Sequence, residues 1–373
     1  MIIKDSGTGE VRVVVEQVNP EAAGMDVSRL TRAFGVMQGT IERHVLLGSG
    51  VVVVRHGQVV AERYWGRATR EPALHASADT IWAMASVTKP VAASAVLLLI
   101  ERGAFRLDDP VAAVLPAFGQ NGKEGVTIRH LLTHTSGLDQ SFESRLDRSQ
   151  MTVESYRDAI YAAGLSAPPG TQVSYCNPAF TLLGSLISEA SGVDHVQFIQ
   201  DEIFLPLGMT STRLRPGPDA IARLADCDGF SQPAALQHIL TSGTLAGGMV
   251  SSPRDIARFG QLFLNSGRWE GQRILSPTTI AAMARNLTAG LPDVGATPPR
   301  PVISRGLGWR LNLDGTMGAF LTPRAYGHGG ASGTMLLMDP ELELVISFVA
   351  NRWGWNGRER DLFLNAITAS IVE

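Results

Sequence analysis

Strand-like segments lie at the two ends of this chain, and their placement constrains the fold more than any other feature. Valine-rich runs at 51–54 and 59–64 flank His56-Gly57. Because glycine adopts a positive φ at little cost, these runs predict a β-hairpin with a tight turn. Three more strand-like segments lie near the other end, at 308–313, 334–338 and 342–349. We therefore expect the two ends of the chain to pair in one antiparallel sheet.

The interior, from about residue 85 to 300, is patterned mainly as helices that proline and glycine interrupt. Its longest apolar run, 91–100, is too short to span a bilayer and predicts a buried helix. An amphipathic helix capped by Asp26 or Ser28 precedes the hairpin. A last helix, at about 358–371, closes the chain.

The 373 residues exceed what one compact core usually holds, so the length predicts two lobes or one elaborate domain. The simplest α+β arrangement places 1–84 and 305–373 in a sheet lobe and 85–304 in a mainly helical lobe. Since binding sites favour clefts between lobes, we expect the site there.

Composition and charge exclude several classes of protein. Hydrophobic residues make up 45% of the chain and charged ones 18%, which is typical of a globular protein. The net charge of −3 provides no basic field for nucleic acid or an anionic membrane, so we expect neither as a partner. The two cysteines, Cys176 and Cys227, support neither a disulfide framework nor a zinc site. Residues 1–17 lack the apolar stretch of a secretion signal, which predicts a cytoplasmic protein.

The first motif with chemical meaning is Ser86-Val87-Thr88-Lys89, at the start of the buried helix. A three-residue offset puts Ser86 and Lys89 on one helix face, so an ammonium can lie beside the hydroxyl. Serine is a nucleophile only when a neighbour takes its proton, and free N–H groups at a helix start can stabilise a negative oxygen. Without other motifs, a capping serine beside a solvated lysine is the simpler interpretation.

Two further motifs are Tyr175-Cys176-Asn177 and His328-Gly329-Gly330. From the composition, each of the three motifs is expected by chance only about 0.1 to 0.2 times. Alone, Tyr175 fits a half-buried aromatic residue and Asn177 a turn residue. The three motifs in one chain indicate a site that activates a serine.

These motifs resemble those of the serine β-lactamase and penicillin-binding-protein superfamily, most closely its class C β-lactamase and family VIII carboxylesterase branch. Other segments that look like family stretches are LLTHTSGL at 131–138, AGGM at 246–249 and GLGW at 306–309. The resemblance extends from about residue 20 to the C-terminus. It implies a five-stranded antiparallel sheet flanked by the first and last helices, beside an all-helical lobe.

The resemblance also implies a role for each motif residue. Ser86 accepts the acyl group, and Lys89 assists in removing its proton. Tyr175 is the general base, since the ammonium of Lys89 favours its phenolate form. Asn177 orients the acyl side of the substrate. The backbone N–H groups of Ser86 and Ala331 form the oxyanion hole.

His328, Gly329 and Gly330 would then form the opposite, substrate-binding wall. A lysine usually occupies the place of His328 in the lactamase pattern, where it offers a permanent cation to a substrate carboxylate. Histidine is mostly neutral at pH 7, which favours neutral substrates. Arg352 or Arg358, after the last strand, is a candidate to replace the missing charge.

Four other residues have simpler interpretations. His130 and His134 are four apart, but no third ligand accompanies them, so we expect structural roles, with His134 bonding backbone near the site. We expect no metal and no cofactor. Cys176 has no histidine placed to activate it and fits a packing role. Ser332 lacks the last glycine of a nucleophile elbow and is interpreted as structural.

The sequence therefore predicts a serine hydrolase that cleaves short-chain carboxylic esters through an acyl-enzyme at Ser86. Alternatives with the same chemistry are a β-lactamase, a D-aminopeptidase or amidase, and a transacylase. An inactive binding protein on the same scaffold is the alternative from another class. The sequence leaves the oligomeric state open.

Overall fold

The computed structural model describes residues 18–146, 152–230, 233–294, 303–355 and 357–373. The N-terminal residues used to judge a secretion signal lie outside these ranges, so the cytoplasmic location stays a prediction. Within the described ranges, no helix combines the length and the apolar character needed to cross a bilayer.

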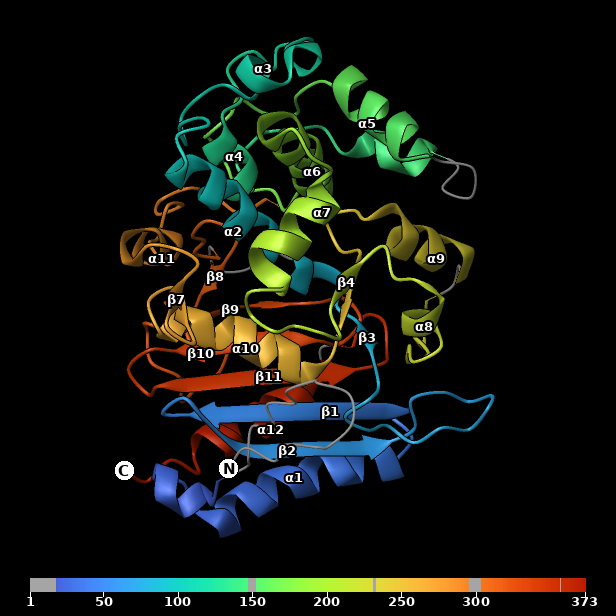
Figure 1. Ribbon diagram of the computed structural model, residues 1–373, viewed down its shortest axis with the longest axis vertical. Helices are drawn as coiled ribbons and strands as arrows, with labels where there is room; N and C mark the ends of the chain where they lie inside the picture. Colours follow the sequence, from blue (N-terminus) through green and yellow to red (C-terminus); the bar gives the residue numbers. More distant parts are fainter. Residues whose placement is uncertain (1–17, 147–151, 231–232, 295–302, 356) are drawn as a thin grey trace, which may run out of the picture.

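An antiparallel sheet joins the two ends of the chain, as the sequence predicts (Figure 1). Within the described ranges its strands are, in spatial order, β2 (Gln58–Gly66), β1 (Gly48–Arg55), β11 (Leu344–Ala350), β10 (Met335–Asp339), β9 (Tyr326–Gly329) and β8 (Arg310–Leu311). Strands β1 and β11 pair from Ser49 opposite Ala350 to Arg55 opposite Leu344. The expected number of five strands is exceeded by one, because the two-residue strand β8 adds to the edge of β9.

The hairpin between β1 and β2 forms at the predicted place. His56 and Gly57 have φ values of 51° and 73°, and Arg55 lies opposite Gln58. Two consecutive positive φ values give the turn whose twist matches that of the flanking strands. The local sequence therefore sets the register next to the turn, and a shift between Val53 and Val54 changes it farther along the hairpin.

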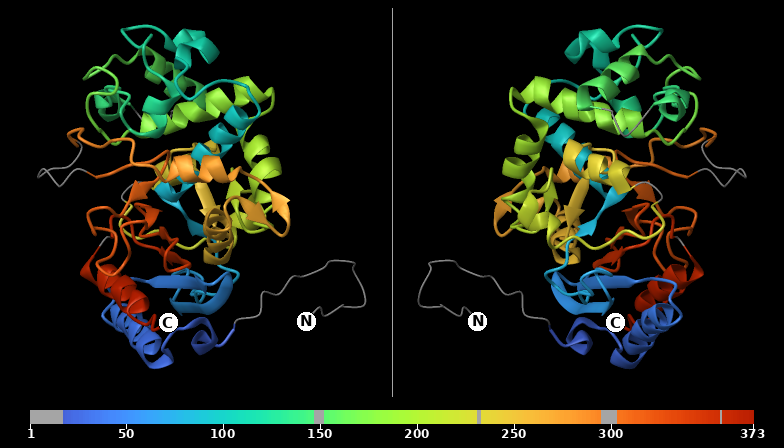
Figure 2. Two further views of the ribbon diagram at one scale, coloured as in Figure 1. Left: turned by 90° about the vertical axis from the view of Figure 1, so that its left-hand side faces the viewer. Right: turned by 90° about the vertical axis from the view of Figure 1, so that its right-hand side faces the viewer.

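Helices cover both faces of the sheet. On one face, α1 (Val27–Glu42) and α12 (Arg358–Thr368) lie side by side against the sheet (Figure 2). Their core includes alternate strand residues such as Val51 and Ile346. On the other face, α10 (Pro253–Leu264) packs on β10, β11 and β1, and Phe259 joins a core that includes Val52. Side chains alternate between the two faces because the pleat has a period of two residues.

The rest of the interior is mainly helical, as expected. Its helices are α2 (Thr88–Glu101), α3 (Val111–Val114), α4 (Ile128–Leu132), α5 (Val153–Ala162), α6 (Asn177–Ser191), α7 (His195–Ile199), α8 (Pro218–Ile221), α9 (Pro233–Ser242) and α11 (Pro277–Met283). It is not purely helical, because it also contains a small sheet of β3 (Trp82–Ala83), β5 (Met249–Ser251) and β4 (Arg213–Leu214), and a hairpin of β6 (Arg268–Trp269) and β7 (Gln272–Arg273).

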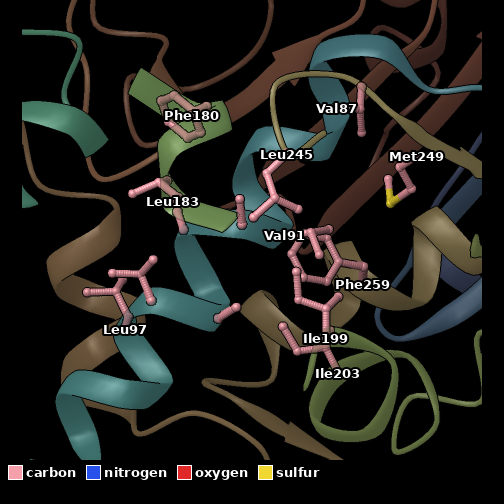
Figure 3. Packing of buried hydrophobic residues seen from close by; sticks show 14 of the residues in the cluster. Val87, Val91, Leu97, Phe180, Leu183, Ile199, Ile203, Leu245, Met249 and Phe259 are labelled. Atoms are coloured by element: carbon pink, nitrogen blue, oxygen red, sulfur yellow. The ribbon is translucent and has the colours of Figure 1, made fainter. Parts of the chain in front are cut away.

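Helix α2 lies at the centre of this core. Every residue from Thr88 to Leu99 is buried, as the apolar run predicts. Figure 3 shows Val91 and Leu97 of α2 among Phe180 of α6 and Ile199 of α7. The start of α2, which carries the first motif, is therefore held by a buried hydrophobic core.

Candidate active site

Ser86 lies in the single turn Ala85–Val87 that leads into α2. Ala85 has a φ of 45°, a left-handed conformation that residues with a side chain seldom adopt. The turn is fixed by Thr88, whose hydroxyl donates to the Ala85 carbonyl at 2.6 Å and accepts from the Met249 N–H at 3.2 Å. Ser86 is thus presented on a strained, well-supported turn at a helix start.

The ammonium of Lys89 lies against the Ser86 hydroxyl. Its Nζ is 3.0 Å from Ser86 Oγ, 3.0 Å from Asn177 Oδ1 and 2.6 Å from the Ala246 carbonyl oxygen. These three acceptors match the three N–H bonds of an ammonium. The Lys89 side chain is fully buried, so its position is set by these contacts. The structure places this group beside the hydroxyl, where the three-residue spacing predicts it.

The Tyr175 ring lies beside the same ammonium. Lys89 Nζ is 4.8 Å from the centroid of the Tyr175 ring. The His134 ring stacks on the Tyr175 ring, with 4.4 Å between centroids and 26° between planes. The His328 ring is 6.2 Å away. Residues that are far apart in the sequence therefore meet around one phenol ring.

His134 fixes the segment that carries Tyr175. Its carbonyl oxygen accepts from the Ser174 N–H at 2.9 Å, and its Nδ1 accepts from the Cys176 N–H at 3.0 Å. The backbone is thus tied on both sides of Tyr175. Burial, more than the nearby cations, lowers the pKa of His134 well below its usual value, so the ring is neutral. The expectation that His134 bonds backbone near the site is confirmed.

The turn between β9 and β10 is tied to the segment before Ser86. Thr334 Oγ1 donates to the Met84 carbonyl at 2.9 Å, and Ser332 Oγ donates to the Ala83 carbonyl at 2.5 Å. Gly330 approaches so closely that a Cβ there would lie 2.2 Å from Thr334 Oγ1 and 2.4 Å from the Met84 oxygen. The structural role expected for Ser332 is therefore confirmed, and the turn carries Ala331 to the wall shared with Ser86.

His328 is buried beside Tyr175 and is neutral. Burial, followed by the charge of Lys89, lowers the pKa of His328 to about 3. Its Nδ1 donates to the Gly329 carbonyl at 2.8 Å, so Nε2 carries the free lone pair. His328, Gly329 and Gly330 do not themselves line the cavity described below. Direct substrate contact by these three residues stays a prediction.

A cavity of about 670 Å³ opens beside the motif residues. Ser86, Tyr175, Asn177 and Ala331 line one end of it. From there it continues between α5 and α6, along a face of α6 that carries Thr181, Ser185 and Ser188. Residues spaced by three or four lie on one side of a helix, so α6 forms a continuous wall. The volume is within the range of small-molecule sites.

Arg305 is a site neighbour that the sequence reasoning missed. Its Cζ lies 5.3 Å from the Tyr175 ring centroid, and the residue is 7% exposed. The only sequence signal is its position directly before the family-like segment at 306–309. Of the two arginines suggested to supply a cation, Arg352 is used elsewhere, because its guanidinium donates to the Val45 carbonyl, whereas the role of Arg358 stays a prediction.

The described residues contain no cluster of three or more His, Cys, Asp or Glu side chains with the arrangement of a metal site. The expected structural role of His130 is confirmed, since its Nδ1 accepts from the Thr127 N–H at 3.1 Å and completes the N-terminal cap of α4. Cys176 is buried, and burial raises the pKa of its thiol to about 12, so it is a packing residue.

The fold and the site together define a β-lactamase-like serine hydrolase. A family model described as "Beta-lactamase" matches residues 31–369, and the chain belongs to this family.

Relatives of known name agree with this assignment. Penicillin-binding protein 4 of Amycolatopsis lactamdurans is 31% identical over 266 residues, which cover 68% of this chain and 67% of that protein. Esterase EstB of Burkholderia gladioli is 32% identical over 210 residues, 52% of this chain and 53% of that protein. Among solved structures, "EstCE1, a hydrolase with promiscuous acyltransferase activity" has a TM-score of 0.79 at 25% identity and covers 91% of this chain and 99% of its own.

Proposed function

We propose that this serine hydrolase cleaves neutral carboxylic esters through an acyl-enzyme at Ser86. The observation that carries the proposal is the buried Lys89 ammonium, which contacts Ser86 Oγ and lies over the Tyr175 ring at one end of the cavity. A cation in this position lowers the free energy of a phenolate and of an alkoxide at the same time. It supports proton transfer between the two side chains.

In the acylation step, Ser86 Oγ forms a bond to the ester carbonyl carbon while its proton passes to the Tyr175 phenolate. The carbonyl oxygen becomes an oxyanion, which the N–H groups of Ser86 and Ala331 stabilise. When the bond to the leaving oxygen breaks, Tyr175 returns the proton and the alcohol departs. Water then attacks the acyl-enzyme by the same sequence, giving the acid and free Ser86.

The preference for neutral esters rests on the neighbourhood of His328. Because its buried ring is neutral, it offers no permanent charge to a substrate carboxylate. Two relatives reported above, EstB and EstCE1, are an esterase and a hydrolase by name, which supports the proposal. The cavity volume also admits substrates larger than the short-chain esters that the sequence suggested.

The test is trapping of the intermediate. Brief incubation with a nitrophenyl ester, followed by acid quenching and peptide mass spectrometry, should show the acyl group on Ser86. The Ser86→Ala variant should show none. Unmodified Ser86 in an enzyme that still turns over the ester would refute the proposal.

The Tyr175→Phe variant tests the general base. Because the variant keeps the ring but loses the phenol oxygen, it should keep the fold and lose about 100-fold to 10,000-fold in kcat. A wild-type rate would remove Tyr175 from the mechanism.

A substrate panel ranks the possible activities. Nitrophenyl esters of increasing chain length, a chromogenic cephalosporin and D-aminoacyl amides are compared by kcat/KM. We expect the esters to lead. A higher kcat/KM for the cephalosporin or the amides would show that lactam or amide hydrolysis, not ester hydrolysis, is the main activity. Addition of a simple alcohol tests whether an acceptor other than water takes the acyl group.

A further inference from the structure

We propose that Arg305 is a positioning residue for this reaction: through its contact with the Tyr175 ring, it stabilises the phenolate form of Tyr175, which becomes neutral when it accepts the proton of Ser86. The inference rests on the proposed function. It concerns a residue outside the sequence motifs, and it follows from the place of one buried guanidinium.

The first observation is the burial of an incompletely paired cation. Arg305 is 7% exposed, and its Nε is buried without a hydrogen-bond partner within the described part of the chain. Burial lowers the pKa of Arg305, which shows that the site disfavours its charge. A buried donor without a partner calls for an explanation, and the surroundings of Arg305 supply one.

The second observation is the direction in which the guanidinium lies. Its Cζ is 5.3 Å from the Tyr175 ring centroid, and Lys89 Nζ is 4.8 Å from the same centroid. Tyr175 lines the cavity, whereas Arg305 does not. The contact through which Arg305 reaches the cavity is therefore its contact with Tyr175.

The third observation is that the backbone on both sides of this residue is fixed. The Arg305 N–H donates to Thr288 Oγ1 at 3.0 Å, and its carbonyl accepts from the Leu287 N–H at 2.9 Å. A cation with a fixed backbone needs little reorganisation when charge develops beside it.

Among the described residues, two cations lie close to the Tyr175 ring. The His134 ring stacks on the Tyr175 ring and the His328 ring is 6.2 Å away, and both histidines are neutral because of burial. Lys89 and Arg305 carry the positive charge, and the charges of Asp293 and Arg310 act on Arg305. Lys89 also bonds Ser86, so Arg305 is the cation near the phenol that is not shared with the nucleophile.

The experiment compares Arg305→Met with Arg305→Lys over a range of pH. In R305M, the acidic limb of the pH profile should shift up by about one pH unit, so kcat/KM on that limb should fall by up to about 10-fold, with recovery at high pH. R305K should restore the position of the limb. The difference in ultraviolet absorbance between R305M and R305M/Y175F reports the tyrosinate form of Tyr175. This form should appear at a higher pH than in the difference between wild type and Y175F.

Arg55 provides a matched control. It is also buried, its Nε and Nη1 have no hydrogen-bond partner in the described residues, and burial lowers its pKa, yet it lies in β1. Arg55→Met should change the melting temperature and leave the shape of the pH profile as in wild type.

A loss in R305M that is the same at every pH would overturn the proposal, because it would show a structural role only. Wild-type activity in R305M would overturn it as well. Mass spectrometry of wild-type Ser86 separates the role of Arg305 from the proposed function. If the acyl adduct forms but R305M keeps the wild-type pH profile, only the role of Arg305 is refuted. If no adduct forms, the acyl-enzyme is refuted, and the role of Arg305 with it.

Discussion

Replacing Lys89 by methionine separates its catalytic effect from its effect on stability. The change removes three hydrogen bonds from a charged donor, each of which is worth about 1.5 to 3 kcal/mol. It also removes the cost of burying an ammonium, which is several kcal/mol for one ion. Because these contributions oppose each other, the free energy of unfolding should change by no more than about 2 kcal/mol.

The effect on catalysis should be much larger than the effect on stability. Without the ammonium, neither the Ser86 hydroxyl nor the Tyr175 ring has its shared cation, and proton transfer between them is disfavoured. We expect kcat/KM for a nitrophenyl ester to fall about 1000-fold, within the range for loss of acid–base assistance. Denaturant unfolding and steady-state kinetics on the same preparation give both quantities.

Lys123 is the matched control. It is fully buried, and its Nζ donates to the Tyr161 and Ala163 carbonyls at the end of α5. Lys123→Met should change stability by a similar amount and reduce kcat/KM by less than about fivefold, because Lys123 has no contact with the serine. The reasoning fails if K89M keeps more than about a tenth of the wild-type kcat/KM, or if K123M loses as much as K89M.

Two further predictions concern the turn after β9 and the buried histidines. Gly330→Ala would place a Cβ 2.4 Å from the Met84 oxygen and displace Ala331, so kcat should fall about 100-fold. Gly329→Ala is the control: its added Cβ would have its nearest neighbour 3.8 Å away, so its kcat should stay close to that of wild type. Equal kinetics for the two variants would contradict this account of the turn. Below pH 6.5 the unfolded chain protonates His328 while the folded chain does not, so this residue should lower the free energy of unfolding by about 2 kcal/mol between pH 7 and 5. The buried, neutral His134 acts in the same direction. In urea unfolding, a His328→Asn variant should lose about 2 kcal/mol of the wild-type pH dependence, and an unchanged dependence would disprove this role.

The features predicted correctly are those that neighbouring residues decide. His56 and Gly57 form the hairpin turn because two positive φ values are needed there and few residues supply them. Asp26 caps α1 by accepting from the Arg29 N–H three residues later. The contact between Ser86 and Lys89 follows from one helical turn.

The features that were missed are contacts between distant segments. Nothing near Arg305 in the sequence indicates that its guanidinium lies at the Tyr175 ring, 130 residues earlier in the chain. The suggestion that Arg352 replaces the missing cation was wrong for the same reason. After the last strand, the course of the chain turns its guanidinium toward the Val45 carbonyl. Such contacts depend on how whole elements pack. Bringing two distant segments together costs loop-closure entropy, but it requires no local residue pattern from which the contact could be predicted.

For this hydrolase, the order of residues along the chain was enough to predict the contact between Ser86 and Lys89, the strands at both ends and the family. Packing established the rest: the neutral state of His328, the course of the cavity along α6, and the second cation beside the phenol. The physical reason is the separation along the chain of the residues that interact. Turns, caps and one-turn contacts draw their energy from adjacent residues, whereas burial, pKa and cavity shape sum over neighbours that only the folded chain brings together.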